Sequence, residues 1–328
     1  MKVGLTLGKF APLHKGHQHV IETALAEMDR VIVMIYACPE TIDCPLDIRA
    51  QWIRDLYPKV EVLEAPDGPT MIGDTPEIKK AHEDYILKRL DGRKVTHFYN
   101  SEFYGEHVSK ALGAENRLVD TERAQFPVSG TAVRNAPFGN RHFIDPRVYR
   151  DLITNVVLVG APSTGKTTLT EALAKEFGTA WMPEYGREYW DEHQVDRRLT
   201  LEQLVEIAEG HIEREDKAIL EADRYLFTDT NAITTYMFSL YYHGKAHYRL
   251  HELAKLAEKR YDLTFVCGDE IPYDDTWDRS GEVNRADFQQ QIIEDLKQRG
   301  VPFVVLPGSI KDRIEIVREN LAGFRKDL

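Results

Sequence analysis

Gly160-Ala161-Pro162-Ser163-Thr164-Gly165-Lys166-Thr167 is the stretch that decides the fold of the second half of this chain. It matches the phosphate-binding pattern G-x-x-x-x-G-K-[ST] at every fixed position. The apolar run 155–159 before it predicts a buried strand, and residues 168–177 after it predict a helix. Because the motif requires a strand, a loop and a helix in that order, this context favours a P-loop over an ordinary glycine-rich βα turn.

The loop indicates an ATP site. Backbone N–H groups and a helix N-terminus would surround a phosphate there. We predict that Lys166 reaches the β- and γ-phosphates and that the Thr167 hydroxyl ligates Mg²⁺. The other predicted nucleotide contacts are Gly160, Ser163, Thr164, Gly165 and Thr168. A P-loop fold normally starts at this strand, so we expect two domains, 1–150 and 151–328.

Composition limits the alternatives. The 328 residues, 42% of them apolar, suffice for two globular cores, and no apolar run approaches membrane-spanning length. A strand predicted over 2–7 argues against a signal peptide. Three cysteines without metal spacing favour a reducing cytoplasm. Residues 1–150 carry 20 basic and 21 acidic side chains and residues 151–328 carry 22 and 33, so neither half favours a nucleic-acid partner.

The first strand leads directly into a histidine motif, Gly8-Lys9-Phe10-Ala-Pro-Leu-His14-Lys-Gly16-His17. The two histidines flank Gly16 where a strand turns into a helix, which is where an open α/β sheet binds an anion. We predict that His14 and His17 donate N–H bonds to phosphate, most strongly when protonated. We expect Gly8, Lys9, Phe10 and Gly16 to lie along the nucleotide. A capped helix start is the simpler alternative.

A second constellation is Ser129-Gly130-Thr131-Ala-Val-Arg134. Two hydroxyls and one guanidinium near a helix start suit the far phosphates of a nucleotide, although an N-cap beside a surface arginine would look the same. Between the two motifs, predicted strands and helices alternate, which indicates a doubly wound parallel sheet. The predicted strands are 31–36, 60–63, 95–99 and 117–119, and the helices are 47–56, 76–90 and 104–112. Both motifs would then line one cleft at the carboxyl edge of the sheet.

In the second half, the segment 181–190 is dense in charged and aromatic residues. Glu184 is a candidate to take a proton from an acceptor hydroxyl, and Tyr185, Tyr189 or Trp190 could stack on a flat ring. A packed aromatic helix start is the alternative. The strand 225–229 ends in Asp229, the Walker B position for Mg²⁺, with an N-cap as the rival reading. Glu184 and Asp229 both remain candidates for the general base.

Three further features complete the second half. The polar segment 271–285 is expected to be a mobile lid, with Arg279 as the catalytic cation and Arg285 as a second candidate to close over the transferring phosphoryl group. Residues 307–309 could border the adenine. His243, His247 and His251 are spaced four apart, which predicts one solvated helix face rather than a metal site.

The motifs G-K-F-x-P-x-H-x-G-H and S-x-T-x-x-R resemble the nucleotidyltransferase family of nicotinamide-mononucleotide adenylyltransferases, as do segments 101–105 and 120–123. Joined to a P-loop kinase, the whole chain resembles the bifunctional NadR proteins. The resemblance implies two ATP- and Mg²⁺-dependent activities. One phosphorylates nicotinamide riboside, and the other adenylylates nicotinamide mononucleotide to give NAD and pyrophosphate.

NadR regulators carry an N-terminal helix-turn-helix, whereas this sequence starts at the first catalytic strand, so we expect the two enzymes and not the repressor. A homo-oligomer is compatible with the sequence. Two other functions remain open: the same chemistries on a different, pantetheine-type acceptor, and a non-catalytic NAD or ATP sensor.

Overall fold

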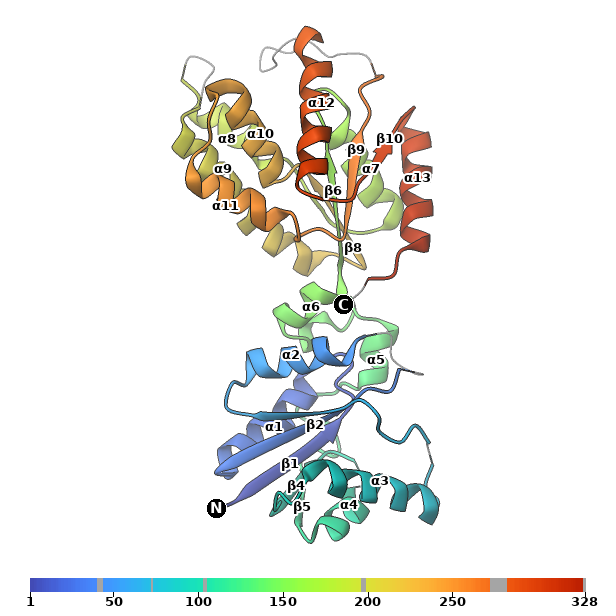
Figure 1. Cartoon of the computed structure of the whole chain (residues 1–328). Helices are drawn as coiled ribbons and strands as arrows, with labels where there is room; N and C mark the ends of the chain where they lie inside the picture. The colour runs from blue at the N-terminus through green and yellow to red at the C-terminus, as the bar shows by residue number, and fades with distance from the viewer. Residues whose placement is uncertain (40–43, 72, 103–104, 196–198, 272–281, 327–328) are drawn as a thin grey trace. The chain divides into compact units, whose positions relative to one another are not determined.

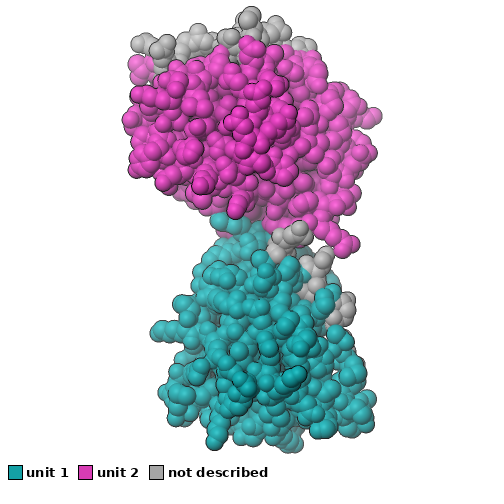
Figure 2. Space-filling model, viewed as in Figure 1, with its two compact units in different colours: residues 1–151, 327–328 teal, residues 152–326 magenta. Residues whose placement is uncertain are grey.

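The computed structural model describes residues 1–39, 44–71, 73–102, 105–195, 199–271 and 282–326, and for 282–284 only the backbone. These residues form two compact units (Figure 2), which we call unit 1, residues 1–151, and unit 2, residues 152–326. Each unit is built around its own five-stranded sheet.

Unit 1 contains a parallel sheet of strand order β3-β2-β1-β4-β5. Its strands are β1 (Val3–Gly8), β2 (Arg30–Tyr36), β3 (Glu61–Ala65), β4 (His97–Asn100) and β5 (Glu115–Leu118). Its helices are α1 (Lys15–Glu27), α2 (Leu46–Leu56), α3 (Pro76–Leu90), α4 (Gly105–Leu112), α5 (Gly130–Asn135) and α6 (Pro146–Leu152, which crosses the unit boundary). Since β1 pairs with both β2 and β4, the winding reverses at β1. Ligands bind at the carboxyl end of such a reversal, which here is the histidine motif.

Helices cover both faces of this sheet (Figure 1). Leu5, Ile32 and Met34 are buried on the face covered by α3 and α4, where they join Ile86 and Val108 in one apolar cluster. Side chains alternate between the two faces along a strand, so the neighbours of these residues in each strand point to the opposite face. They are also buried, and α1 and α2 cover that face. The alternating βα pattern of the sequence therefore follows from burial on both faces of a parallel sheet.

Unit 2 contains a second parallel sheet, of order β10-β9-β6-β8-β7. Its strands are β6 (Thr154–Val159), β7 (Trp181–Met182), β8 (Tyr225–Asp229), β9 (Leu263–Cys267) and β10 (Val304–Leu306). Its helices are α7 (Lys166–Phe177), α8 (Tyr185–His193), α9 (Leu201–Ala218), α10 (Ala232–His243), α11 (Tyr248–Ala257), α12 (Glu282–Gln298) and α13 (Ile310–Gly323). β6 lies at the centre of the sheet and every one of its residues is buried.

The central strand divides the core of unit 2 into two clusters. Val156 and Leu158 pack with α7 and α13 on one face. Val157 and Val159 pack with α9, α10, α11 and α12 on the other, as the layers in Figure 1 show. The P-loop follows directly from this strand, so its position is fixed by the most buried element of the unit.

The predicted fold class, two doubly wound parallel α/β domains, is confirmed. One local prediction is wrong. His243 ends α10, and Gly244, with φ of +65°, breaks the helix so that His247 becomes the N-cap of α11. The three histidines therefore do not share one helix face, and no cluster of metal-ligating side chains occurs among the described residues. Within the same residues, no helix is both long and apolar enough to cross a membrane.

Candidate functional site

In unit 1 the two motif histidines lie against each other at the start of α1. The rings of His14 and His17 are stacked, with centroids 3.7 Å apart and planes 23° apart. His14 is the N-cap residue but makes no side-chain capping bond, so the simple capping alternative does not explain it. Both of its ring nitrogens, and Nδ1 of His17, are buried without a partner among the described residues. Buried polar atoms are rarely left unpaired, so this site is suited to a polar ligand.

The surroundings keep both imidazoles neutral. Burial lowers the pKa of His14 to about 4, and the nearby guanidinium groups of Arg123 and Arg134 act in the same direction. Burial, followed by His14 and the same two arginines, holds the pKa of His17 well below its usual range. The free protein therefore favours neutral imidazoles, which donate to phosphate less strongly than the protonated form would. Two arginines beside imidazole nitrogens that have no partner among the described residues form an environment that favours an anion.

The structure brings the second predicted motif to the same place. Arg134 donates from Nη1 to the Ala11 carbonyl at 2.7 Å, inside the histidine motif, and from Nη2 to Thr131 Oγ1 at 3.2 Å. A Cβ on Gly130 would lie 3.9 Å from His14 Nε2. Ser129 caps α5 by accepting from the Ala132 N–H at 3.1 Å, so its hydroxyl has a structural role.

Other residues of the first motif have separate roles. Gly8 ends β1, and Gly16 lies so close to His14 that a Cβ on it would be 3.1 Å from Cε1. Phe10 is 2% exposed, and its ring meets His17 edge-on at 5.0 Å, so it supports the histidine by packing and has little surface for a nucleotide.

Arg49 is a residue that the sequence patterns did not reveal. Its side chain is buried, and it donates to the carbonyls of Lys9, Tyr36, Ala37 and Cys44. It therefore ties the loop after β1, which begins the histidine motif, to the end of β2. An arginine at an apolar helix position was the available signal, because a buried guanidinium needs several acceptors.

In unit 2 the P-loop backbone turns through three residues with positive φ. Gly160 and Gly165 adopt φ of +144° and +80°, and Ser163, which is not a glycine, adopts +61°. A Cβ on Gly160 would lie 3.0 Å from Thr164 Oγ1 and 3.1 Å from the Cys267 carbonyl, so a larger residue would strain the backbone and force its neighbours to shift. Lys166 donates to the carbonyls of Gly160 and Ala161 at 3.0 Å, and its Nζ therefore lies over the loop that would hold the phosphates.

The two residues predicted to hold a metal ion are in direct contact. Thr167 Oγ1 donates to Asp229 Oδ2 at 2.6 Å, while Asp229 Oδ1 is buried and unpaired among the described residues. Burial raises the pKa of Asp229 to about 6, the nearby Glu184 carboxylate acts in the same direction, and Lys166 opposes both. The N-cap reading of Asp229 is wrong, because Asn231 caps α10. An unpaired buried carboxylate oxygen beside a hydroxyl fits a hard divalent cation.

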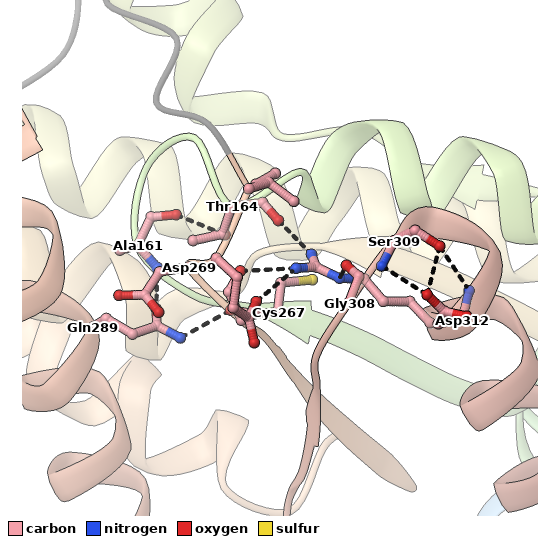
Figure 3. A network of polar contacts seen from close by, with 12 residues as sticks. Ala161, Thr164, Cys267, Asp269, Gln289, Gly308, Ser309 and Asp312 are labelled. Atoms are coloured by element: carbon pink, nitrogen blue, oxygen red, sulfur yellow. Dashed lines mark hydrogen bonds and ion pairs between the residues drawn. The ribbon is translucent and has the colours of Figure 1, made fainter.

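Two further buried residues hold the P-loop to neighbouring elements (Figure 3). Gln289 of α12 accepts from the Ala161 N–H at 2.7 Å and donates to the Cys267 carbonyl at 2.8 Å. Arg313 of α13 is 1% exposed and donates to the carbonyls of Thr164, Gly308 and Gly268 at 2.7, 3.0 and 3.0 Å. Arg313 thereby joins the Gly308 carbonyl to the P-loop, and the expectation that 307–309 borders the adenine stays a prediction. Thr168 is exposed at the start of α7.

On the acceptor side, Glu184 is the N-cap residue of α8 but makes no capping bond through its side chain. It is half-buried at the start of the helix, and its carboxylate is close enough to Asp229 to raise the pKa of that group. Of the aromatic candidates, Tyr189 is buried and donates to Glu206, so the packed-helix alternative holds for that ring. Tyr185 lies against α9 at Gly210, with the Arg214 guanidinium 4.0 Å from its ring centre.

In the described part of segment 271–285, the structure differs from the predicted lid. Arg285 lies in α12, is 8% exposed, and donates to the carbonyls of Ile271 and Asp269 at 3.1 and 2.9 Å. It is therefore a structural residue and not a free cation. Arg279 lies outside the described residues.

Comparisons with known proteins match the two units to two different families. The family described as cytidylyltransferase-like matches residues 5–136, and the family described as AAA domain matches residues 155–313. The trifunctional NAD biosynthesis/regulator protein NadR of Escherichia coli (strain K12) is 29% identical, over 98% of this chain and 84% of its own.

Two crystal structures of NadR proteins share the fold. One, in complex with NR, has a TM-score of 0.58 at 22% identity and covers 97% of this chain and 95% of its own. The other, in complex with NAD and AMP-PNP, has a TM-score of 0.58 at 24% identity and covers 99% of this chain and 97% of its own. Similarity along nearly the whole chain, with both domains in the same order, makes this chain NadR-like.

Proposed function

We propose that this chain is a bifunctional NAD biosynthesis enzyme, in which unit 2 is a ribosylnicotinamide kinase and unit 1 is a nicotinamide-nucleotide adenylyltransferase. The observation that carries the proposal is the placement of two separate motifs suited to phosphate, the histidine motif after β1 and the P-loop after β6, each at the carboxyl edge of its own sheet. The NadR relative and the NadR structures with NR and with NAD and AMP-PNP supply the substrate class. The kinase product is then the substrate of the adenylyltransferase.

In unit 1 the phosphate of nicotinamide mononucleotide attacks the α-phosphorus of ATP, and pyrophosphate leaves. The attacking oxygen is already ionised, so no general base is required. Catalysis consists of alignment and charge stabilisation, for which the site offers His14, His17 and Arg134. Arg123, whose charge lowers the pKa of both imidazoles, is a further cation facing the same anion.

In unit 2 the 5′-hydroxyl of nicotinamide riboside attacks the γ-phosphorus of ATP. Lys166 would turn from the loop carbonyls toward the β- and γ-phosphates. Glu184 would take the hydroxyl proton, because its side chain has no capping role whereas Asp229 is already bonded to Thr167. Arg279 stays our candidate for the cation that stabilises the transferred group.

Thr167 and Asp229 would hold Mg²⁺. When bound there, the ion would neutralise phosphate charge, as in other P-loop enzymes. The fit rests on the unpaired Oδ1 of Asp229 and on the contact of its Oδ2 with the Thr167 hydroxyl. We also place the enzyme in a reducing cytoplasm, on the basis of its three free cysteines.

The proposal is tested by incubating the purified chain with Mg²⁺, ATP and a panel of nucleosides and mononucleotides, with products identified by mass. Nicotinamide riboside should yield its mononucleotide, and the mononucleotide should yield the dinucleotide. Turnover of a pantetheine-type acceptor instead, or nucleotide binding without turnover, would support the two rival functions. Neither rival is favoured, because the NadR similarity runs through both domains.

A further inference from the structure

Thr230 follows Asp229 in an unusual backbone conformation. Its φ is +66°, in the left-handed region. A β-branched residue reaches that region only at a cost in free energy, and such strain is often found at functional sites. The Thr230 N–H donates to the Leu158 carbonyl at 2.9 Å, and the next residue, Asn231, caps α10. The chain therefore changes direction within one residue of the Asp229 carboxylate.

His211 of α9 contacts this strained residue. Its imidazole hydrogen-bonds to the Thr230 backbone, and the side chain is 4% exposed. Nε2 is buried without a partner among the described residues, which leaves Nδ1 for the bond to Thr230. An unpaired buried nitrogen costs stability, and an apolar side chain would avoid that cost. A packing role alone therefore does not account for a histidine here.

One of the charged groups around His211, Glu184, belongs to the candidate kinase site. Burial dominates and lowers the pKa of His211, while Glu215 and Glu184 favour the charged imidazole and Arg260 opposes it. Glu215 is itself bonded to Arg260, Asn155 and Tyr261, so that side of the histidine is fixed. His211 thus links a rigid buried network to the residue that follows Asp229.

We propose that His211 is a positioning residue of the kinase: it holds Thr230 in the left-handed conformation and so keeps the Asp229 carboxylate against the Thr167 hydroxyl, where Mg²⁺ would bind. The inference rests on the proposed function of unit 2. It assigns His211 no contact with substrate. Replacing His211 should therefore change the Mg²⁺ requirement and kcat, and leave KM for the acceptor unchanged.

The first test compares His211→Leu, His211→Asn and His211→Gln. The amide nitrogen of Asn replaces Nδ1, and that of Gln replaces Nε2. His211→Leu should raise the Mg²⁺ concentration needed for half-maximal ATP binding, and lower kcat, by about 10-fold or more, the range for residues that orient metal ligands. His211→Asn should retain most of the wild-type Mg²⁺ affinity and kcat, whereas His211→Gln should behave like His211→Leu. Exposed His251, changed to Leu, is the matched control.

The second test is a double-mutant cycle with Thr230→Gly, because glycine adopts positive φ without strain. The effect of His211→Leu on the Mg²⁺ concentration for half-maximal ATP binding, and on kcat, should be several-fold smaller in the Thr230→Gly background than in the wild type. Additive effects, rescue by Gln rather than Asn, or a folded His211→Leu variant with wild-type Mg²⁺ dependence would overturn the proposal. ATP binding needs no acceptor, so a wild-type chain that fails to phosphorylate the riboside would refute the proposed function and leave this test intact.

Discussion

Arg313 Nη1 donates a 2.7 Å hydrogen bond to the carbonyl oxygen of Thr164, which lies 149 positions earlier in the P-loop. In unit 1, Arg49 makes the corresponding contact with the Lys9 carbonyl at the start of the histidine motif. Each phosphate-binding loop is thus held by one buried arginine from a distant helix. The fixed loop geometry that phosphate binding requires therefore depends on residues outside both motifs.

Arg313→Met should destabilise unit 2 by about 3 kcal/mol, since three carbonyls, two of them buried, lose their donor. ATP affinity of the kinase should fall as well. The matched control is Arg318→Met on the same helix, because its ion pairs with Glu176 and Glu315 are exposed and should be worth less than about 1 kcal/mol. Urea unfolding measures the free energy of unfolding of both variants. Equal losses would show that the hydrogen bonds of Arg313 to the P-loop do not stabilise unit 2.

Glu184→Gln should lower kcat for riboside phosphorylation by about 10²-fold, the scale for a lost general base, with little change in ATP affinity. Glu188→Gln on the same helix is the control, because Glu188 is exposed and paired with Arg214. Single-turnover phosphoryl transfer separates chemistry from product release. A wild-type rate for Glu184→Gln would leave Asp229 as the candidate base.

His17→Ala should reduce kcat for adenylylation by about 10²-fold, as for a lost donor to a developing charge, with a smaller change in KM for ATP. Steady-state kinetics with saturating mononucleotide distinguish the two parameters. A change in KM alone would mean that His17 binds only ground-state ATP.

The stability of unit 1 should fall as the pH falls from about 6.5 to about 4. The pKa of His14 is lowered to about 4 in the folded protein, so the unfolded chain binds more protons throughout that window, and acid favours unfolding. Added pyrophosphate should oppose the loss by favouring the charged imidazole. Thermal unfolding at pH 7, 6 and 5 measures the slope. His14→Asn should make it shallower, whereas the exposed control His142→Asn should not.

The sequence patterns predicted strands and helices well where burial is periodic. The strand 225–229 and the helix 76–90 have the predicted bounds, because apolar runs and a capping Thr75 followed by proline are local signals. Arg49, Gln289 and Arg313 could not be found in this way. Their roles depend on carbonyls far away in the chain, and a buried arginine has no sequence period of its own.

The errors have the same physical origin. The polar, turn-rich composition of segment 271–285 predicts a lid that carries Arg285, but α12 begins within that segment and buries the side chain. The histidine motif lies between β1 and α1, at the strand-to-helix turn that the sequence predicts. Its protonation state could not be predicted, because burial and the charges of Arg123 and Arg134 emerge only when the fold brings residues 14, 17, 123 and 134 together.

We propose that two independent sites act in sequence on one chain. The most direct measurement supplies nicotinamide riboside, Mg²⁺ and ATP to the wild type and to Lys166→Ala, and follows the mononucleotide and NAD by mass. The wild type should convert the riboside to NAD through the mononucleotide. Lys166→Ala should lose the first step and still convert added mononucleotide to NAD at a near-normal rate. A correctly folded Lys166→Ala variant that loses both steps would contradict the two-site account.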